Sequence, residues 1–208
     1  MYNPAHFAIS DAAQICDFVR RNPFATLAAV IDGEVHFAYV PVILDDAAGS
    51  LGRLHFHFAR ANPMVALQDG ERILVSMLGA HAYVSPDWYE SPNQVPTWNY
   101  TAVEGSGTVK RLDGEHTVRY LERLAAEQEA TLLPKTPWSP AKVAPEQLKK
   151  LLLGIVGFEL ALDRLEGKAK LSQNKTKADI RGVIGALRDR GDAMAAAVAA
   201  AMQKTSLP

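Results

Sequence analysis

The segment KLSQNK (170–175) holds a serine, a glutamine and an asparagine between two lysines, directly before a predicted helix. Residues 168–190 contain seven lysines and arginines and two aspartates, so this window carries 7 − 2 = +5, whereas the whole chain carries −1. The free N–H groups and the dipole at a helix start favour an anion. Ser172, Gln173 and Asn174 therefore indicate either an anion site or a capped helix start among solvated lysines.

A second polar group follows a predicted strand. Arg60 follows the predicted strand 54–58 and precedes a helix start at Pro63. Asn62 is placed to cap this helix. Arginine beside a helix start also suits a phosphate. His55 and His57 point to one face of the strand, as two metal ligands would, but no third ligand follows at a suitable spacing. We therefore predict no metal site.

Aromatic residues gather in HAYVSPDWY and VPTWNY, between residues 81 and 100. They are Tyr83, Trp88, Tyr89, Trp98 and Tyr100. A flat ring could be held between such side chains. Buried aromatics that anchor a loop are the commoner reason for such density.

Several function classes lack support in the sequence. It contains no glycine-rich phosphate loop, no dinucleotide fingerprint and no serine or cysteine nucleophile in a recognisable context. We assign no catalytic residue. The single cysteine, Cys16, allows neither an internal disulfide nor a cysteine-rich zinc site, which is typical of a reducing compartment. Because no apolar run approaches about 18 residues, we expect a cytoplasmic protein without a membrane segment.

Hydrophobic periodicity predicts the elements that position these groups. Six strands are predicted, at residues 24–31, 35–44, 54–58, 71–79, 97–112 and 154–165, with residues 81–84 extending the fourth after a break. Asp32-Gly33 indicates a hairpin between the first two strands, and DDAAGS (45–50) indicates the next turn. Helices are predicted at 11–22, from Pro63, at 115–131, after Pro145, at 176–190 and after the Gly191-Asp192 break.

This order of elements predicts an α+β, β-rich fold, with an antiparallel sheet or small barrel decorated by helices. The last two helices have the outline of a helix-turn-helix. However, DAMAAAVAAAMQ lacks arginine, lysine or asparagine where base edges would be read. We therefore do not expect direct DNA binding. The alanine-rich face instead favours close packing against another helix, of this chain or of a partner subunit.

Six ordered motifs carry a resemblance to a known family. They are MYNPAHF, NPFATL, HFHFARANP, GAHAYVSPDWY, VPTWNY and GKAKLSQNK. Together they resemble the PaiB-type FMN-binding negative transcriptional regulators of the FMN-binding split-barrel superfamily, which also holds pyridoxamine-phosphate oxidases and flavin reductases. Phe56 departs from the pattern, in which Gly precedes the second histidine.

The resemblance implies a six-stranded antiparallel split β-barrel with peripheral helices over residues 1–170, and a C-terminal helical extension over residues 171–208. It also implies a homodimer with FMN in a cleft between the subunits. The function expected is a redox- or metabolite-linked role in negative regulation of transcription. The alternative is an NAD(P)H-dependent flavin reductase or oxidase of the same superfamily.

The resemblance further implies three groups of FMN-binding residues. Contacts to the phosphate or ribityl chain are expected from Arg60 and Asn62, with His57 on the strand that leads to them. Contacts beside the flavin ring are expected from Thr97, Trp98 and Asn99, with Tyr83 in the aromatic group. Donors to the phosphate or the ring edge, from the same or the partner subunit, are expected to be Lys170, Ser172, Gln173 and Asn174.

Overall fold

The computed structural model describes residues 1–46 and 51–206. Its α-helices are α1 (Ala12–Arg21), α2 (Gly114–Ala130), α3 (Pro145–Leu153), α4 (Lys177–Asp189) and α5 (Ala193–Ser206). Its strands are β1 (Ala8–Ile9), β2 (Phe24–Ile31), β3 (Glu34–Pro41), β4 (Ile43–Asp45), β5 (Arg53–Ala59), β6 (Arg72–Val84), β7 (Thr97–Arg111) and β8 (Ile155–Lys170). Short 3-10 helices are η1 (Ala5–Phe7), η2 (Pro63–Ala66), η3 (Pro86–Trp88) and η4 (Pro140–Lys142).

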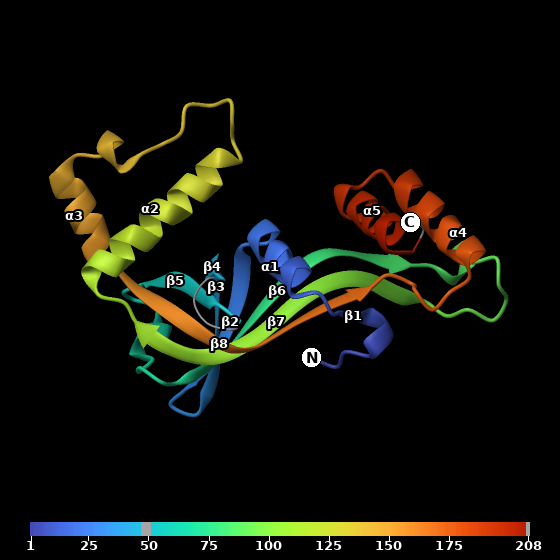
Figure 1. The fold of residues 1–208 in the computed structure, drawn as a ribbon, viewed down its shortest axis with the longest axis horizontal. Coiled ribbons are helices and arrows are strands. Elements are labelled where there is room, and N and C mark those ends of the chain that lie inside the picture. The colour runs from blue at the N-terminus through green and yellow to red at the C-terminus, as the bar shows by residue number, and fades with distance from the viewer. Residues whose placement is uncertain (47–50, 207–208) are drawn as a thin grey trace. The chain divides into compact units, whose positions relative to one another are not determined.

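Two compact units divide the chain, and each is built from segments that are distant in sequence. Unit 1 comprises Met1–Phe18, Met77–Glu104 and Glu166–Pro208, and unit 2 comprises Val19–Ser76 and Gly105–Leu165. Strands β6, β7 and β8 contribute residues to both units (Figure 1). The predicted boundary between residues 170 and 171 stays a prediction, and Lys170 is the last residue of β8.

Within the described residues the sheet has eight strands, in the order β3-β2-β6-β7-β8-β5-β4, with β1 paired to β8. The α+β class is confirmed, but the predicted count of six strands is wrong for two reasons. Pro41 has no N–H to continue the ladder, so the predicted strand 35–44 divides into β3 and β4 around Val42. Strand β8 also continues beyond residue 165, and this end pairs with Ala8 and Ile9.

The predicted barrel is not closed. Strands β3 and β4 lie at opposite ends of the strand order, although only Val42 separates them in the chain. This short link requires the sheet of unit 2 to curve back on itself. Among the strand pairs that the described residues form, none joins β3 to β4. The sheet is therefore a curved, open relative of the expected six-stranded split barrel.

The core of unit 2 follows from the alternation along β5. Leu54, Phe56 and Phe58 are fully buried, whereas the histidines between them lie on the other face. The Phe56 ring stacks on Phe158 of β8, with centroids 5.9 Å apart and an interplanar angle of 10°. Phe56, which departs from the family pattern, is therefore a core residue.

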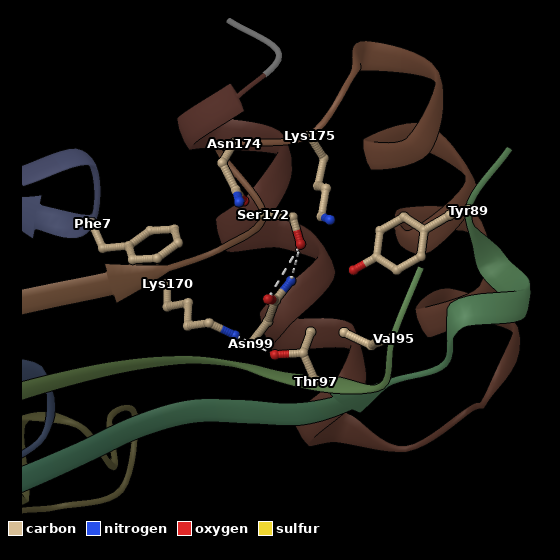
Figure 2. Close-up of a pocket in the computed structure, with 9 residues that line it drawn as sticks. All are labelled: Phe7, Tyr89, Val95, Thr97, Asn99, Lys170, Ser172, Asn174 and Lys175. Carbon is tan, nitrogen blue, oxygen red and sulfur yellow. Dashed lines mark hydrogen bonds between the residues drawn. The ribbon is translucent and has the colours of Figure 1, made fainter. Parts of the chain in front are cut away.

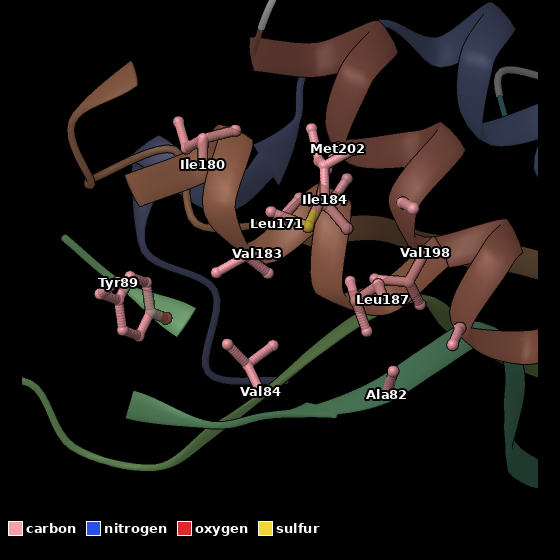
Figure 3. Close-up of a cluster of buried hydrophobic side chains, with 12 residues drawn as sticks. Ala82, Val84, Tyr89, Leu171, Ile180, Val183, Ile184, Leu187, Val198 and Met202 are labelled. Atoms are coloured by element: carbon pink, nitrogen blue, oxygen red, sulfur yellow. The ribbon is translucent and has the colours of Figure 1, made fainter. Parts of the chain in front are cut away.

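The C-terminal helices α4 and α5 pack on each other and on the end of β6 within unit 1 (Figure 3). Their buried cluster comprises Ala82, Val84, Tyr89, Leu171, Ile180, Val183, Ile184, Leu187, Ala195, Val198, Ala199 and Met202. The prediction that the alanine-rich helix packs closely on another helix is confirmed. The helix that it contacts is α4 of the same chain.

The predicted turns, breaks and short helices agree with the structure in some places and differ in others. Asp32 and Gly33 have φ of 53° and 82°, as the predicted hairpin requires. Residues 47–50 of the predicted turn DDAAGS lie outside the described residues. Strand β6 runs without the predicted break, and the helix predicted from Pro63 is only the 3-10 turn η2. None of the described helices is long and apolar enough to cross a membrane.

Candidate functional site

A pocket of about 180 Å³ lies in unit 1, between the start of β7, the end of β8 and the turn before α4 (Figure 2). Its lining residues are Phe7, Tyr89, Val95, Thr97, Asn99, Lys170, Ser172, Asn174 and Lys175. The structure thus brings together predicted FMN-binding residues from two segments more than sixty residues apart. These are Thr97 and Asn99 from VPTWNY, and Lys170, Ser172 and Asn174 from KLSQNK.

The polar side chains in the turn at KLSQNK do not cap helix α4. Ser172 adopts a left-handed conformation with φ of 65°, and the Lys175 N–H donates to the Ser172 carbonyl over 3.0 Å. Helix α4 is capped by Thr176, whose Oγ1 accepts from the Asp179 N–H over 3.1 Å. Because Thr176 supplies the cap, the preceding polar residues are not needed for it. A capped helix start therefore does not account for Ser172 and Asn174 in this turn.

Asn99 and Ser172 hold the two sides of the pocket together. Both are almost completely buried, and Asn99 Nδ2 donates to Ser172 Oγ over 2.9 Å. The Ser172 hydroxyl also lies 3.3 Å from Asn99 Oδ1. Buried amide and hydroxyl groups must be paired in this way to offset the loss of water. The pair therefore fixes β7 against the turn that carries the pocket lysines.

The two pocket lysines are bound only to neutral acceptors. Lys170 Nζ donates to Thr97 Oγ1 and, over 2.6 Å, to the Trp98 carbonyl. Lys175 Nζ donates to Gln94 Oε1 over 2.6 Å. Within the part of the chain that the structure describes, neither ammonium group forms an ion pair. Burial, together with the nearby positive charges of Lys168 and Lys175, lowers the pKa of Lys170. The pocket is therefore positively charged and suited to an anion.

Tyr89 presents a buried hydroxyl to this pocket. Its side chain is only 9% exposed, and the hydroxyl has no hydrogen bond of normal geometry within the described residues, although Ser172 lies close to it (Figure 2). Burial raises the pKa of Tyr89; the Ser172 hydroxyl partly offsets this, and the Asp179 carboxylate adds to it. The phenol is therefore neutral near pH 7 and able to donate to a ligand.

Asp179 ties the segment that carries Tyr89 to helix α4. Its carboxylate accepts from the Ser91 N–H over 2.9 Å and from the Ser91 hydroxyl over 2.8 Å. These hydrogen bonds, the one from the backbone first, lower the pKa of Asp179 from 3.8 to about 2. A lowered pKa means that ionised Asp179 stabilises the fold above about pH 4, and that this contribution is lost as the pH falls towards 2.

We therefore expect Asp179→Asn to lower the thermal unfolding midpoint at pH 7, because the amide cannot replace two charge-assisted hydrogen bonds. The difference from the wild type should narrow between pH 4 and pH 2. Circular dichroism melts over this pH range measure both effects. The control is Asp87→Asn, since Asp87 is exposed in the same segment. A difference that is unchanged from pH 7 to pH 2 would contradict this account.

Three predicted residues of unit 1 do not line the pocket. Tyr83 and Trp98 are exposed and form an edge-to-face pair with centroids 6.2 Å apart. The Gln173 amide is engaged by its own turn, accepting from the Leu171 N–H and donating to the Ala169 carbonyl. Their contact with a flavin stays a prediction.

The remaining predicted residues, His57, Arg60 and Asn62, belong to unit 2. His57 Nδ1 lies 3.1 Å from the Tyr120 hydroxyl, and burial lowers the pKa of His57. Arg60 donates to the Leu153 and Ile155 carbonyls, over 2.7 and 3.2 Å. Asn62 caps η2, as predicted, by accepting from the Met64 N–H. Flavin contacts from these residues also stay predictions.

The sequence interpretation did not assign four lining residues to the cofactor. Tyr89 and Lys175 had a visible signal, because they belong to the aromatic group and to KLSQNK. Phe7 lies within MYNPAHF and Val95 begins VPTWNY, but neither is polar. Phe7 directly precedes β1, and only the pairing of β1 with β8 places it here.

Comparisons with known proteins show the family of this chain. Residues 1–164 match a family model described as "Putative FMN-binding domain". The Bacillus subtilis protein named "Protease synthase and sporulation protein PAI 2" is 32% identical over 207 residues, which cover 98% of this chain and 97% of the relative.

Solved structures show a similar fold at low identity. The FAD and heme binding protein from Mycobacterium smegmatis has a TM-score of 0.56 and 17% identity, over 78% of this chain and 73% of that one. The flavocytochrome Anf3 from Azotobacter vinelandii has a TM-score of 0.59 and 11% identity, over 78% and 69%. At these identities the likeness shows the fold alone.

Proposed function

This chain belongs to the PaiB-type family of FMN-binding proteins, and we propose that it is a homodimeric flavoprotein whose bound FMN serves a regulatory role. FMN is the cofactor of the family. FMN supplies hydride and one-electron transfer chemistry, while the protein supplies binding, orientation and tuning. The question for this chain is which of its groups hold the cofactor.

The observation that carries the proposal is the set of donors in the unit 1 pocket. FMN exposes mainly hydrogen-bond acceptors, on its phosphate, ribityl chain and ring carbonyls. Among the described residues, the ammonium groups of Lys170 and Lys175 have no carboxylate partner and the Tyr89 hydroxyl has no hydrogen-bond partner. Asn174 adds an amide at the rim (Figure 2). These residues fit the cofactor, and we propose that they bind it.

Cofactor identity can be tested on the purified protein. We expect the protein to be yellow and to release about one FMN per chain on denaturation. Chromatography of the extract beside FMN, FAD and riboflavin standards identifies the flavin. A colourless protein that fails to take up added FMN would refute the proposed function.

We further propose that the β2–β3 hairpin forms the dimer contact. One face of this hairpin carries exposed apolar side chains, and all of them are 62–68% exposed. These residues are Phe24, Val30, Val35, Phe37 and Tyr39. Exposed apolar patches mark interaction surfaces, and a self-complementary face suits a two-fold contact between identical chains. The homodimer that the family resemblance implies supports a second copy as the occupant.

Tyr39→Asp is expected to weaken this dimer by at least about tenfold, because association would then bury a charge in an apolar contact. Sedimentation velocity over a concentration series measures the shift from dimer to monomer. Leu132→Asp is the matched control, since Leu132 is 54% exposed in a turn outside the hairpin. If both variants dimerise as the wild type does, the hairpin is not the contact.

A regulatory role is supported by the name of the Bacillus subtilis relative, which refers to protease synthase and sporulation. Helix α5 buries apolar residues against α4, and residues 193–202, where a recognition helix would contact base edges, are all alanine, methionine or valine. We therefore propose that regulation depends on the flavin and not on direct DNA contact. Transcript levels in a deletion strain test this: a variant unable to bind FMN should fail to restore them, and equal restoration would refute the role.

A further inference from the structure

We propose that the unit 1 pocket is a phosphate site and, resting on the proposed function, that it takes the phosphate monoester of FMN and not the flavin ring. The proposal assigns direct contacts to Lys175 and Tyr89, in addition to Lys170. It follows from the charge, the donors and the size of the pocket.

The charge of the pocket matches a phosphate monoester. Lys170 and Lys175 both line it, and within the described part of the chain their hydrogen bonds go to neutral oxygens. A phosphate monoester carries about −1.5 to −2 near pH 7, which balances two ammonium groups. The Asp179 carboxylate, which acts on Tyr89 electrostatically, does not line the pocket and accepts from Ser91. No lining residue is acidic, so an anion entering the pocket meets attraction.

The positive charges around Lys170 also favour the binding of an anion. Burial lowers the pKa of Lys170, and repulsion from the ammonium groups of Lys168 and Lys175 lowers it further. Lys168 Nζ is itself turned to the Tyr2 carbonyl, over 2.8 Å, and lies 5.4 Å from the centre of the Tyr100 ring. A bound anion would relieve this repulsion and would raise the pKa of Lys170. Phosphate binding should therefore be accompanied by proton uptake where Lys170 titrates.

Tyr89 adds an independent observation. A buried hydroxyl without a hydrogen-bond partner is destabilising, and a phosphate oxygen could accept its hydrogen bond. The Tyr89 side chain is more than nine-tenths buried and its hydroxyl points into the pocket (Figure 2). Lys175 Nζ lies 5.2 Å from the centre of the same ring. The two groups are therefore placed to contact one ligand.

The size of the pocket separates the phosphate from the ring. Sites that enclose drug-sized ligands usually measure about 300–1,000 Å³. The unit 1 pocket measures about 180 Å³, which suits the compact end of a ligand. The paired side chains of Asn99 and Ser172 close its inner wall. The pocket therefore matches the size of a phosphate and the adjoining carbon better than that of a tricyclic ring.

The experiment compares FMN with riboflavin, which lacks the phosphate, in fluorescence titrations of the full chain freed of flavin. We expect FMN to bind at least about tenfold more tightly than riboflavin. Lys175→Gln and Tyr89→Phe should each weaken FMN by roughly tenfold and leave riboflavin unchanged. Lys177→Gln is the matched control, because Lys177 is exposed at the start of α4 and should affect neither ligand.

Inorganic phosphate distinguishes the possible sources of the anion, and circular dichroism confirms that each variant is folded. In the wild type, phosphate should compete with FMN. If the variants weaken FMN and riboflavin equally, the phosphate assignment is wrong. Lys175→Gln could instead abolish the binding of inorganic phosphate, measured by calorimetry, and leave the affinity for FMN as in the wild type. In that case the pocket binds a free anion and the FMN assignment is overturned.

A wild-type chain that binds no flavin refutes the proposed function, and the calorimetric phosphate titration then decides the anion site by itself. Phosphate binding that Lys175→Gln removes would support the anion site without FMN. No heat of binding would overturn it.

Discussion

Phe56→Ala is expected to lower the free energy of unfolding by about 3–5 kcal/mol, the cost of deleting a buried aromatic ring. Phe56 is fully buried, stacks on Phe158 and meets Phe58 edge-on at 5.3 Å between ring centres. No backbone shift of one strand could fill the resulting cavity, because β5 is paired on both sides, with β4 and β8. Chemical denaturation measures the change.

The resemblance in the sequence led us to expect Gly at this position, which makes Phe56→Gly informative. We expect it to destabilise the chain further than Phe56→Ala, by about 0.5–1 kcal/mol, since glycine loses more backbone entropy on folding. Phe37→Ala is the control, because Phe37 is 63% exposed and should change stability by less than about 0.5 kcal/mol at low protein concentration. Equal effects of Phe56→Ala and Phe37→Ala would contradict the buried position of β5.

Gly182→Ala is expected to destabilise unit 1 by about 1–3 kcal/mol, although alanine is the better helix former. A Cβ at position 182 would lie 2.3 Å from the Trp88 carbonyl oxygen, so α4 would have to move away from η3. Tyr89 follows η3 directly, so this movement should also weaken FMN binding. Thermal melts and FMN titrations measure the two effects.

Gly185 provides the matched control on the same helix. A Cβ there would meet nothing within 4 Å, and the position is exposed. Gly185→Ala should therefore stabilise the chain by up to about 1 kcal/mol through helix propensity alone. If the two variants change stability in the same direction, the close approach of α4 to η3 is not present in solution.

Local chemistry made part of the fold predictable. Asp32-Gly33 specifies a hairpin because both residues tolerate positive φ, and the structure has them at 53° and 82°. Thr176 caps α4 because its hydroxyl reaches the Asp179 N–H, a contact between residues three apart. Alternation along β5 correctly separated the buried phenylalanines from the histidines. Each of these signals lies within a few neighbouring residues.

Strand ends and strand count were less predictable, because they depend on partners. Apolar periodicity fades after Leu165, yet β8 continues to Lys170. Near this end of the strand, Gly167 and Lys168 pair with Ile9 and Ala8. A two-residue strand has no periodicity of its own to detect. The division at Pro41 was visible in principle, since proline cannot donate to a ladder, but the apolar residues around it gave a stronger signal.

The sequence by itself determined most of the elements, the family and the polar segments that carry the chemistry, since these depend on residue types and short spacings. Only the tertiary structure decided which of those residues share a pocket. It joined Lys170, Ser172 and Asn174 to Thr97 and Asn99, added Tyr89, Lys175 and Phe7, and placed His57, Arg60 and Asn62 in unit 2. The physical reason is that the pocket rests on long-range contacts, such as Asn99 with Ser172 and Ala8 with Lys168. No local pattern encodes those contacts.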